Sequence, residues 1–236
     1  MAETNLQVLL RRRPVGAPVP EDFEIVETPV PTPGPGEVLV RARFLSLDPY
    51  MRGRMSEAKS YAQPVPLGGV MEGQTAGEVV ASNAPGFAPG DTVLGGSAWQ
   101  RFSCVAPARL FKVDAQETPL SASLGVLGMP GLTAWVGLED IGTPKAGETV
   151  VISAASGAVG QVAGQIAKIR GCTVVGVAGG ERKCRFVVDT LGFDACIDHR
   201  GDLRAGFDAH CPNGIDVYWE NVGGDVQHEV FPRMND

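Results

Sequence analysis

A glycine-containing turn between an apolar run and a helical pattern is the feature of this chain that could do chemistry. Residues 150–152 are apolar, as in a strand buried on both faces, and residues 162–169 place apolar side chains at helical spacing. The turn between them has the pattern Ala154-x-x-Gly157-x-x-Gly160. Unpaired amide groups and a positive dipole at a helix N-terminus attract a diphosphate, and glycine allows its close approach. The pattern therefore favours a dinucleotide-binding βαβ unit.

Each residue of this turn has an expected role. Gly157 keeps the turn open, and Gly160 lets the helix lie close to the strand. The diphosphate is expected against the helix start, formed by Gly157, Ala158, Val159 and Gly160. The same spacing also occurs in tight turns that bind no ligand, but the strand before it, the helix after it and a second strand over 173–178 favour binding.

The end of the second predicted strand bears on which nicotinamide cofactor binds. In NAD enzymes an acidic residue about 20 positions beyond the glycine turn binds the ribose 2′-hydroxyl. Here Gly179 and Gly180 follow the strand, and they leave room for the 2′-phosphate of NADP(H). Lys183 follows shortly after, and it is interpreted either as a phosphate ligand or as a solvated lysine of a first helical turn. Glu181 would repel a phosphate, so we expect it on the outer face of that helix.

The second half of the chain alternates predicted strands and helices. A helical stretch over 119–141, interrupted at 128–134, precedes the glycine turn. Beyond the second strand, the pattern predicts a helix over 181–191, a strand over 195–198, a helix over 202–211, a strand over 215–219 and a last helix from 225. This order is typical of an α/β fold with a doubly wound parallel sheet. A complete dinucleotide fold has further strands, so we expect this domain, residues 121–236, to be incomplete at its C-terminus.

The first half of the chain predicts short strands separated by turns rich in proline and glycine. Segment 29–36 is a turn-rich linker, and segment 48–54 interrupts the strand pattern. Strands are predicted over 6–10, 37–45, 77–81, 99–105 and 110–113, and segment 87–94 is a turn that enters a further strand. This arrangement is typical of a compact β-barrel-like domain, which we place at residues 1–120.

Composition excludes several classes of protein. The chain has 236 residues, of which 44% are hydrophobic and 20% charged, as in ordinary globular proteins. Its net charge of −7, without a basic patch, makes nucleic acid an unexpected partner. No apolar run has the length of a membrane span, and the N-terminal charges follow a short apolar stretch, which is the reverse of a signal peptide. We expect a cytoplasmic protein.

The cysteine and histidine patterns favour neither a disulfide framework nor a metal site. No cysteine pair has C-x-x-C spacing, and the histidines all lie in the second half of the chain. The cysteines are Cys104, Cys172, Cys184, Cys196 and Cys211.

Five stretches together resemble the medium-chain dehydrogenase/reductase superfamily, in its zinc-independent branch of alkenal double-bond reductases. They are LSLDPYMRGRM at 45–55, GVLGMPGLTAWVGL at 125–138, ISAASGAVGQVAGQIAK at 152–168, LGFDACIDH at 191–199 and WENVGG at 219–224. The branch includes prostaglandin reductases and bacterial NADPH-dependent curcumin reductases, and the second half most resembles the latter. Zinc-dependent members carry a Gly-His-Glu motif where this chain has GGVMEG. The resemblance implies a GroES-like catalytic domain followed by a Rossmann domain.

The resemblance also implies cofactor-binding residues. Lys183 matches a lysine that binds the 2′-phosphate of NADP(H), and His199 stands where relatives have a tyrosine near the same phosphate. Met129 and Thr133 match positions that border the nicotinamide. Asn221 matches an asparagine that contacts the nucleotide. Met129 is otherwise a plausible core residue, and Asn221 a plausible turn residue before two glycines.

The implied reaction is hydride transfer from NADPH to the β-carbon of an α,β-unsaturated ketone or aldehyde. Tyr50 matches a tyrosine of the substrate pocket that donates a hydrogen bond to the enolate oxygen. The second tyrosine of the family falls beyond Asp236. The alternatives to this function are an NADPH quinone oxidoreductase and a truncated NADP-binding protein without catalysis. Relatives often dimerise through the nucleotide domain, so a homodimer is an expectation for the full-length form.

Overall fold

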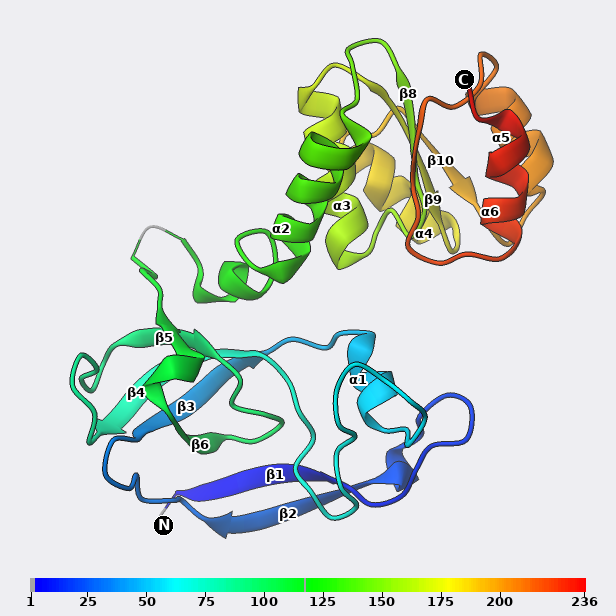
Figure 1. Cartoon of the computed structure of the whole chain (residues 1–236). Helices are drawn as coiled ribbons and strands as arrows, with labels where there is room; N and C mark the ends of the chain where they lie inside the picture. Colours follow the sequence, from blue (N-terminus) through cyan, green and yellow to red (C-terminus); the bar gives the residue numbers. More distant parts are fainter. Residues whose placement is uncertain (1–2, 117) are drawn as a thin grey trace. The chain divides into compact units, whose positions relative to one another are not determined.

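The computed structural model describes residues 3–116 and 118–236, and the chain divides into two compact units between Leu124 and Gly125 (Figure 1). The first unit is rich in β-strands, and the second contains a parallel sheet with helices on both faces. The predicted fold class is therefore confirmed.

Two antiparallel sheets form the first unit. Strand β1 (Thr4–Leu10) pairs with β2 (Phe23–Pro29) along its whole length. The second sheet has the strand order β6-β3-β4-β5-β7 and encloses a cluster of buried valines with Leu110. Its strands are β3 (Val38–Leu45), β4 (Thr75–Ser82), β5 (Thr92–Gly95), β6 (Phe102–Val105) and β7 (Leu110–Lys112). Short 3-10 turns lie at Pro20–Asp22, Pro107–Arg109 and Leu120–Leu124.

A short helix, α1 (Tyr50–Arg54), follows β3 where the sequence predicts only a break in the strand pattern. Met51 in this helix is buried, and Met55, the residue that follows the helix, joins Val65 and Met71 in a second buried cluster. The helix is thus anchored at its C-terminal end by apolar packing.

The second unit is a four-stranded parallel sheet with the order β10-β9-β8-β11. Figure 1 shows α2 and α3 on one side of it and α5 and α6 on the other. Alternate strand residues serve the two faces: Val150 and Ile152 pack beneath α2 and α3, whereas Val151 packs with Phe207 of α5. Such continuous apolar strands are what a sheet covered on both faces requires.

The elements of the second unit have the following bounds. The strands are β8 (Thr149–Ile152), β9 (Thr173–Ala178), β10 (Ala195–Asp198) and β11 (Val217–Trp219). The helices are α2 (Met129–Val136), α3 (Ala158–Ile169), α4 (Glu181–Arg185), α5 (Leu203–His210) and α6 (Asp225–Val230). Wider π-type turns at Gly137–Gly142 and Phe186–Thr190 extend α2 and α4, and a 3-10 turn at Phe231–Arg233 follows α6. Within the described residues, no helix is both long and apolar enough to cross a membrane.

The predicted interruption of the helix at 128–134 is wrong, because most of this segment forms α2. Pro130 lies in the first turn of the helix, where its missing N–H group costs no hydrogen bond and its fixed φ suits the helix. The break lies earlier: Gly128 is extended and precedes the helix, and its carbonyl accepts a hydrogen bond from the amide of Leu132 at 2.9 Å.

Helix α3 lies unusually close to the loop that follows α4. A Cβ atom added to Gly164 would lie 1.8 Å from Cζ of Phe193, whose ring is 3% exposed. The ring therefore fills the space that a side chain at this position of the helix would need.

We predict that Gly164→Ala destabilises the protein by about 1–3 kcal/mol, although alanine is the better helix former, because the new methyl group overpacks the Phe193 ring. The free energy of unfolding in urea measures the effect. Gly201→Ala is the matched control, since the nearest heavy atom to its added Cβ is 3.5 Å away. Equal stability of the two variants would contradict this reading of the packing.

Candidate dinucleotide-binding site

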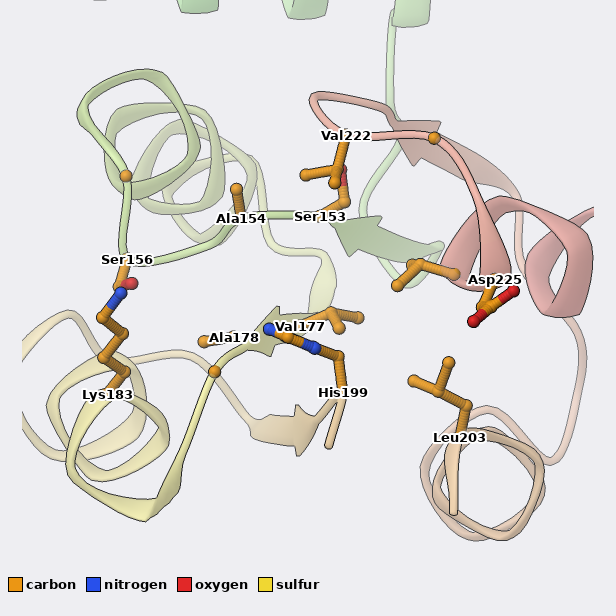
Figure 2. Close-up of a pocket in the computed structure, with 14 residues that line it drawn as sticks. Ser153, Ala154, Ser156, Val177, Ala178, Lys183, His199, Leu203, Val222 and Asp225 are labelled. Atoms are coloured by element: carbon orange, nitrogen blue, oxygen red, sulfur yellow. The ribbon is translucent and has the colours of Figure 1, made fainter. Parts of the chain in front are cut away.

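A cavity of about 420 Å³ opens at the carboxyl ends of the parallel strands of the second unit (Figure 2). The loops after all four strands contribute to its lining. They provide Ser156 and Gly157 after β8, Lys183 beyond β9, His199 after β10, and Val222 and Asp225 after β11. This edge of a doubly wound sheet is where such folds bind their ligands.

The turn after β8 brings the start of α3 directly over the strand. Ala154 adopts a left-handed conformation with φ of 46°, and its carbonyl oxygen accepts a hydrogen bond from the amide of Gly157 at 2.8 Å. A Cβ atom on Gly160 would lie 2.4 Å from that same carbonyl oxygen. The start of α3 is therefore held in a fixed position beside the cavity, and its first amide groups, at Ala158 and Val159, have no partners within the helix.

Asp198 at the end of β10 ties together the two turns that surround the predicted 2′-phosphate position. Its Oδ1 atom accepts hydrogen bonds from the amides of Gly180 at 2.9 Å and Arg200 at 3.1 Å. These two hydrogen bonds stabilise the carboxylate and hold the pKa of Asp198 below its ordinary value. The carboxylate thus forms its hydrogen bonds with backbone amides at this end of the cavity.

Cationic and imidazole groups lie against the glycine pair after β9. A Cβ atom on Gly179 would lie 2.8 Å from Nε2 of His199, and one on Gly180 would lie 3.0 Å from Nη1 of Arg200. Lys183 extends from α4 toward Ser156, as Figure 2 shows. Glycine at these two positions therefore lets the His199 and Arg200 side chains lie close to the backbone, and together with Lys183 they are potential phosphate ligands.

The one acidic residue expected near this position is directed away from it. The side chain of Glu181 is 83% exposed, and its Oε1 atom lies 3.6 Å from Nε of Arg185 in the same helix. Glu181 does not line the cavity. Asp225 does line it, but Figure 2 shows Asp225 and Lys183 at opposite ends.

A second carboxylate, Glu220, holds the loop after β11. Its Oε1 atom accepts hydrogen bonds from the hydroxyl of Ser153 at 2.9 Å, from the amide of Gly223 at 2.7 Å and from the amide of Val222. Its other oxygen accepts a hydrogen bond from the hydroxyl of Tyr218. The buried Ser153 thereby connects the loops that follow β8 and β11, which are neighbours in the sheet.

Asn221 uses its amide group within this same network. Its Nδ2 atom donates a hydrogen bond to the carbonyl oxygen of Ser153 at 2.8 Å, and its Oδ1 atom accepts one from Nε1 of Trp219 at 3.1 Å. The backbone amide of Asn221 donates to the hydroxyl of Ser153 at 2.7 Å. In this structure the side chain holds the loop in place beside the cavity.

The predicted site residues fall into three groups. Gly157, Lys183 and His199 line the cavity together, and Ala158, Val159, Gly160 and Gly180 lie in the turns that border it. Asn221, Met129 and Thr133 do not line it. Met129 and Thr133 lie one turn apart on α2, where the Thr133 hydroxyl donates a hydrogen bond to the Met129 carbonyl oxygen at 2.7 Å.

Tyr50 belongs to the first unit, where it begins α1. Partial burial raises the pKa of its phenol, and the negative charges of Asp48 and Glu72 act in the same direction. The positive charge of Arg54 opposes them.

Sequence reasoning missed Arg200, Asp198, Ser153 and Glu220. Their roles depend on which strand ends are neighbours in the sheet, and no single segment of the sequence predicts the order of the strands. The available signal was a polar residue at the end of each predicted strand, which is where parallel sheets place their ligand contacts.

The described residues contain no group of three or more histidine, cysteine or acidic side chains placed to hold a metal ion.

Comparisons with known proteins agree with this geometry. Residues 6–113 match a family described as the N-terminal domain of oxidoreductase, and residues 158–232 match one described as zinc-binding dehydrogenase. The chain is 54% identical over 234 residues to the NADPH-dependent curcumin reductase of Escherichia coli (strain K12), covering 99% of this chain and 68% of the relative. It is 41% identical over 244 residues to the NADP(+)-dependent 2-alkenal reductase of Nicotiana tabacum, covering 99% of this chain and 71% of the relative.

A third relative, prostaglandin reductase 1 of Bos taurus, is 40% identical over 230 residues, covering 95% of this chain and 68% of the relative. Among solved structures, the crystal structure of CurA in complex with NADPH from Vibrio vulnificus superposes with a TM-score of 0.92 at 50% identity. That alignment covers 98% of this chain and 68% of the other.

We predict that Asp198→Asn lowers the free energy of unfolding at pH 7, because an amide oxygen accepts weaker hydrogen bonds than a carboxylate does. Since folding lowers the pKa of Asp198, its contribution is complete above the ordinary value of 3.8 and is lost as the pH falls through the folded-state pKa. The difference between wild type and variant should therefore shrink between pH 5 and about pH 3, as urea unfolding at each pH would measure.

Asp202→Asn is the control for this substitution. Asp202 caps α5 by accepting a hydrogen bond from the amide of Ala205 at 3.0 Å, and asparagine caps helices equally well. A difference between wild type and Asp198→Asn that stays constant from pH 7 to about pH 3 would show that the carboxylate charge is not what matters.

Proposed function

Because this chain belongs to the medium-chain dehydrogenase/reductase superfamily, we propose that it uses NADPH to reduce the carbon–carbon double bond of α,β-unsaturated ketones and aldehydes. The chain is an NADP-dependent oxidoreductase, as its resemblance to alkenal and curcumin reductases implies. The observation that carries the proposal is that Lys183 and His199 line one cavity with Gly157 and Gly179, while Arg200 lies against the glycine pair beyond β9.

The residues of the cavity fit NADP(H). The unpaired amides at the start of α3 suit the diphosphate, and the part of the cavity lined by Gly179, Lys183 and His199 suits a 2′-phosphate. No carboxylate competes there, since Asp198 faces backbone amides and Glu181 faces outward. Within this proposal, Met129 and Thr133 border the nicotinamide.

When bound, NADPH supplies the hydride that reduces the β-carbon of the substrate. The part we assign to Tyr50 is to donate a hydrogen bond from its phenol to the carbonyl oxygen, where negative charge develops. Because burial and the nearby carboxylates raise its pKa, the phenol keeps its proton at neutral pH and can act as this donor. The loop that Glu220 and Asn221 hold beside Ser153 keeps the rim of the cofactor cavity in place.

The proposal is tested by steady-state oxidation of NADPH with an enone, with the corresponding saturated ketone and with a quinone. We expect turnover with the enone and a product reduced at the double bond, as mass spectrometry would identify. Turnover with the quinone but not with the enone would contradict the proposal and would indicate a quinone reductase. The cytoplasmic location and the homodimer stay predictions.

We predict that Lys183→Ala and Arg200→Ala each weaken NADPH binding by about 10- to 100-fold, because each removes a charge-assisted hydrogen bond to the 2′-phosphate. NADH lacks this phosphate, so its affinity should change by less than about threefold. Fluorescence titration of the nicotinamide measures both. Arg182→Ala is the matched control in the same helix as Lys183, since Arg182 neither lines the cavity nor lies against the glycine pair. An equal loss for NADPH and NADH would exclude phosphate recognition as the role of either residue.

We predict that Tyr50→Phe lowers kcat for enones by about 100-fold, because the developing oxyanion loses a hydrogen-bond donor. The dissociation constant for NADPH should be unchanged, since Tyr50 belongs to the other unit. Single-turnover kinetics with bound NADPH measure the chemical step. A kcat equal to that of wild type would show that Tyr50 takes no part in the chemical step.

A further inference from the structure

Helix α4 turns one side chain toward the interior of the second unit, and that side chain is a thiol. Four of its residues are exposed to solvent, and only Cys184 is partly buried. The Cys184 side chain packs against the apolar cluster that lies under α2 and α3. The inward contact of α4 with the sheet is therefore made mainly by Cys184.

The edge strand β10 presents a second thiol to the same face of the sheet. Side chains alternate along a strand, so Cys196 packs with the same apolar cluster as Cys184, whereas Ile197 belongs to the cluster on the opposite face. Cys196 lies beside Gly176 of β9, which has no side chain to separate it from its surroundings. Helix α4 packs on both of these strands. The two cysteines therefore meet between α4 and β10.

The two thiols share a hydrogen bond. Burial raises the pKa of Cys196, and the hydrogen bond with Cys184 acts in the same direction. A hydrogen bond that raises a pKa stabilises the protonated form, so the Cys196 thiol is the donor and the Cys184 sulfur is the acceptor. Cys196 therefore keeps its proton and directs it at the sulfur of Cys184.

The other cysteines are placed differently. Cys172 donates a hydrogen bond from its thiol to a backbone carbonyl oxygen at 3.3 Å. Cys211 is buried on the opposite face of the sheet, and Cys104 lies in β6 of the first unit. All of the cysteines belong to the described residues, and among them only the pair between α4 and β10 brings two thiols together.

We propose that Cys184 and Cys196 form a reversible disulfide when a hydroperoxide oxidises them, and that this bond weakens NADPH binding by displacing Lys183. The effect on NADPH rests on the cofactor site proposed above, whereas formation of the disulfide does not depend on it.

The oxidation takes two steps, and Cys184 reacts first because the shared hydrogen bond keeps the proton on Cys196. The Cys184 sulfur attacks one oxygen of hydrogen peroxide, the O–O bond breaks, and the products are a sulfenic acid and one water, which carries away the thiol proton. The Cys196 sulfur then attacks the Cys184 sulfur, the S–O bond breaks, and the hydroxyl leaves as a second water with the Cys196 proton. The two thiols together lose two protons and two electrons, and the peroxide is reduced to water.

The disulfide joins the segments that carry the predicted 2′-phosphate ligands. Lys183 directly precedes Cys184 in α4. Asp198, in the same strand as Cys196, already holds the Gly180 amide at the start of α4. Bonded sulfurs lie about 2 Å apart, closer than any non-bonded contact, so α4 must move toward β10 when the bond forms. Lys183 moves with the helix, out of the position in which it lines the cavity.

The test treats the purified protein with hydrogen peroxide and then titrates it with NADPH and NADH, followed by nicotinamide fluorescence. Peptide mass spectrometry, after free thiols are blocked with iodoacetamide in denaturant, identifies a disulfide between Cys184 and Cys196. We expect this disulfide to form and the dissociation constant for NADPH to rise by about tenfold, as for loss of one charge-assisted hydrogen bond. The value for NADH should change by less than about threefold, and dithiothreitol should reverse both the bond and the loss of affinity.

Cys184→Ser and Cys196→Ser should each prevent the disulfide, and peroxide should then leave the affinity for NADPH unchanged. Cys104→Ser, in the other unit, is the matched control and should respond to peroxide as the wild type does. Unfolding midpoints identify a variant that fails to fold, and if Cys196→Ser does, Cys184→Ser decides the comparison.

Two results would overturn the inference: a peroxide-treated wild type without this disulfide, or a disulfide that leaves NADPH affinity unchanged. A loss of affinity that persists in a folded serine variant of the pair would overturn it as well. Failure of the untreated wild type to bind NADPH would instead refute the proposed function, and mass spectrometry would still decide whether the disulfide forms.

Discussion

The contact between the backbone of Ala154 and the start of α3 is the constraint on which the second unit depends. Only hydrogen fits at Gly160, because a Cβ there would lie 2.4 Å from the Ala154 carbonyl oxygen. Ala154 itself takes the left-handed conformation that glycine takes in many such turns, at a cost of roughly 1–2 kcal/mol. This close crossing places the amides of the helix start over the carboxyl end of β8, and the other loops are arranged around that point.

Two carboxylates near the cavity, Asp198 and Glu220, accept hydrogen bonds from protein groups, and basic side chains lie near the predicted phosphate position of this acidic chain. The net charge of the chain is −7, yet Lys183 and His199 line the cavity and Arg200 lies against the glycine pair. Asp198 accepts hydrogen bonds from the amides of Gly180 and Arg200, and Glu220 accepts from the loop after β11. Each carboxylate thus organises a turn while its charge is stabilised by N–H groups, and the side chains left free at that end are basic.

Much of the fold could be predicted from local sequence, because buried parallel strands are continuous apolar runs. Segments 173–178 and 195–198 were predicted with the bounds that β9 and β10 have. Strand β2 was missed because it has no such run: it is half of a two-stranded sheet, and most of its side chains are exposed or only partly buried. The break expected at 128–134 is wrong because Pro130 lies in the first turn of α2, where proline favours the start of a helix.

The site could be predicted only in part. The glycine turn and Lys183 have a local signature, namely strand, turn and helix in succession. The contacts of Arg200 with the glycine pair and of Ser153 with Glu220 join segments that only the order β10-β9-β8-β11 makes neighbours. Likewise, the contact of Cys184 with Cys196 depends on how α4 packs on β10, which no periodicity encodes.

The central claim is that the loops after β8, β9 and β10 form one site that distinguishes NADPH from NADH by its 2′-phosphate. Titration of the wild-type protein with each cofactor at low ionic strength and again at high ionic strength, followed by nicotinamide fluorescence, is the most direct test. We expect NADPH to bind at least about tenfold more tightly at low salt, with a preference that narrows as salt screens the charges. Equal affinities for the two cofactors at low salt would contradict the assignment of this site.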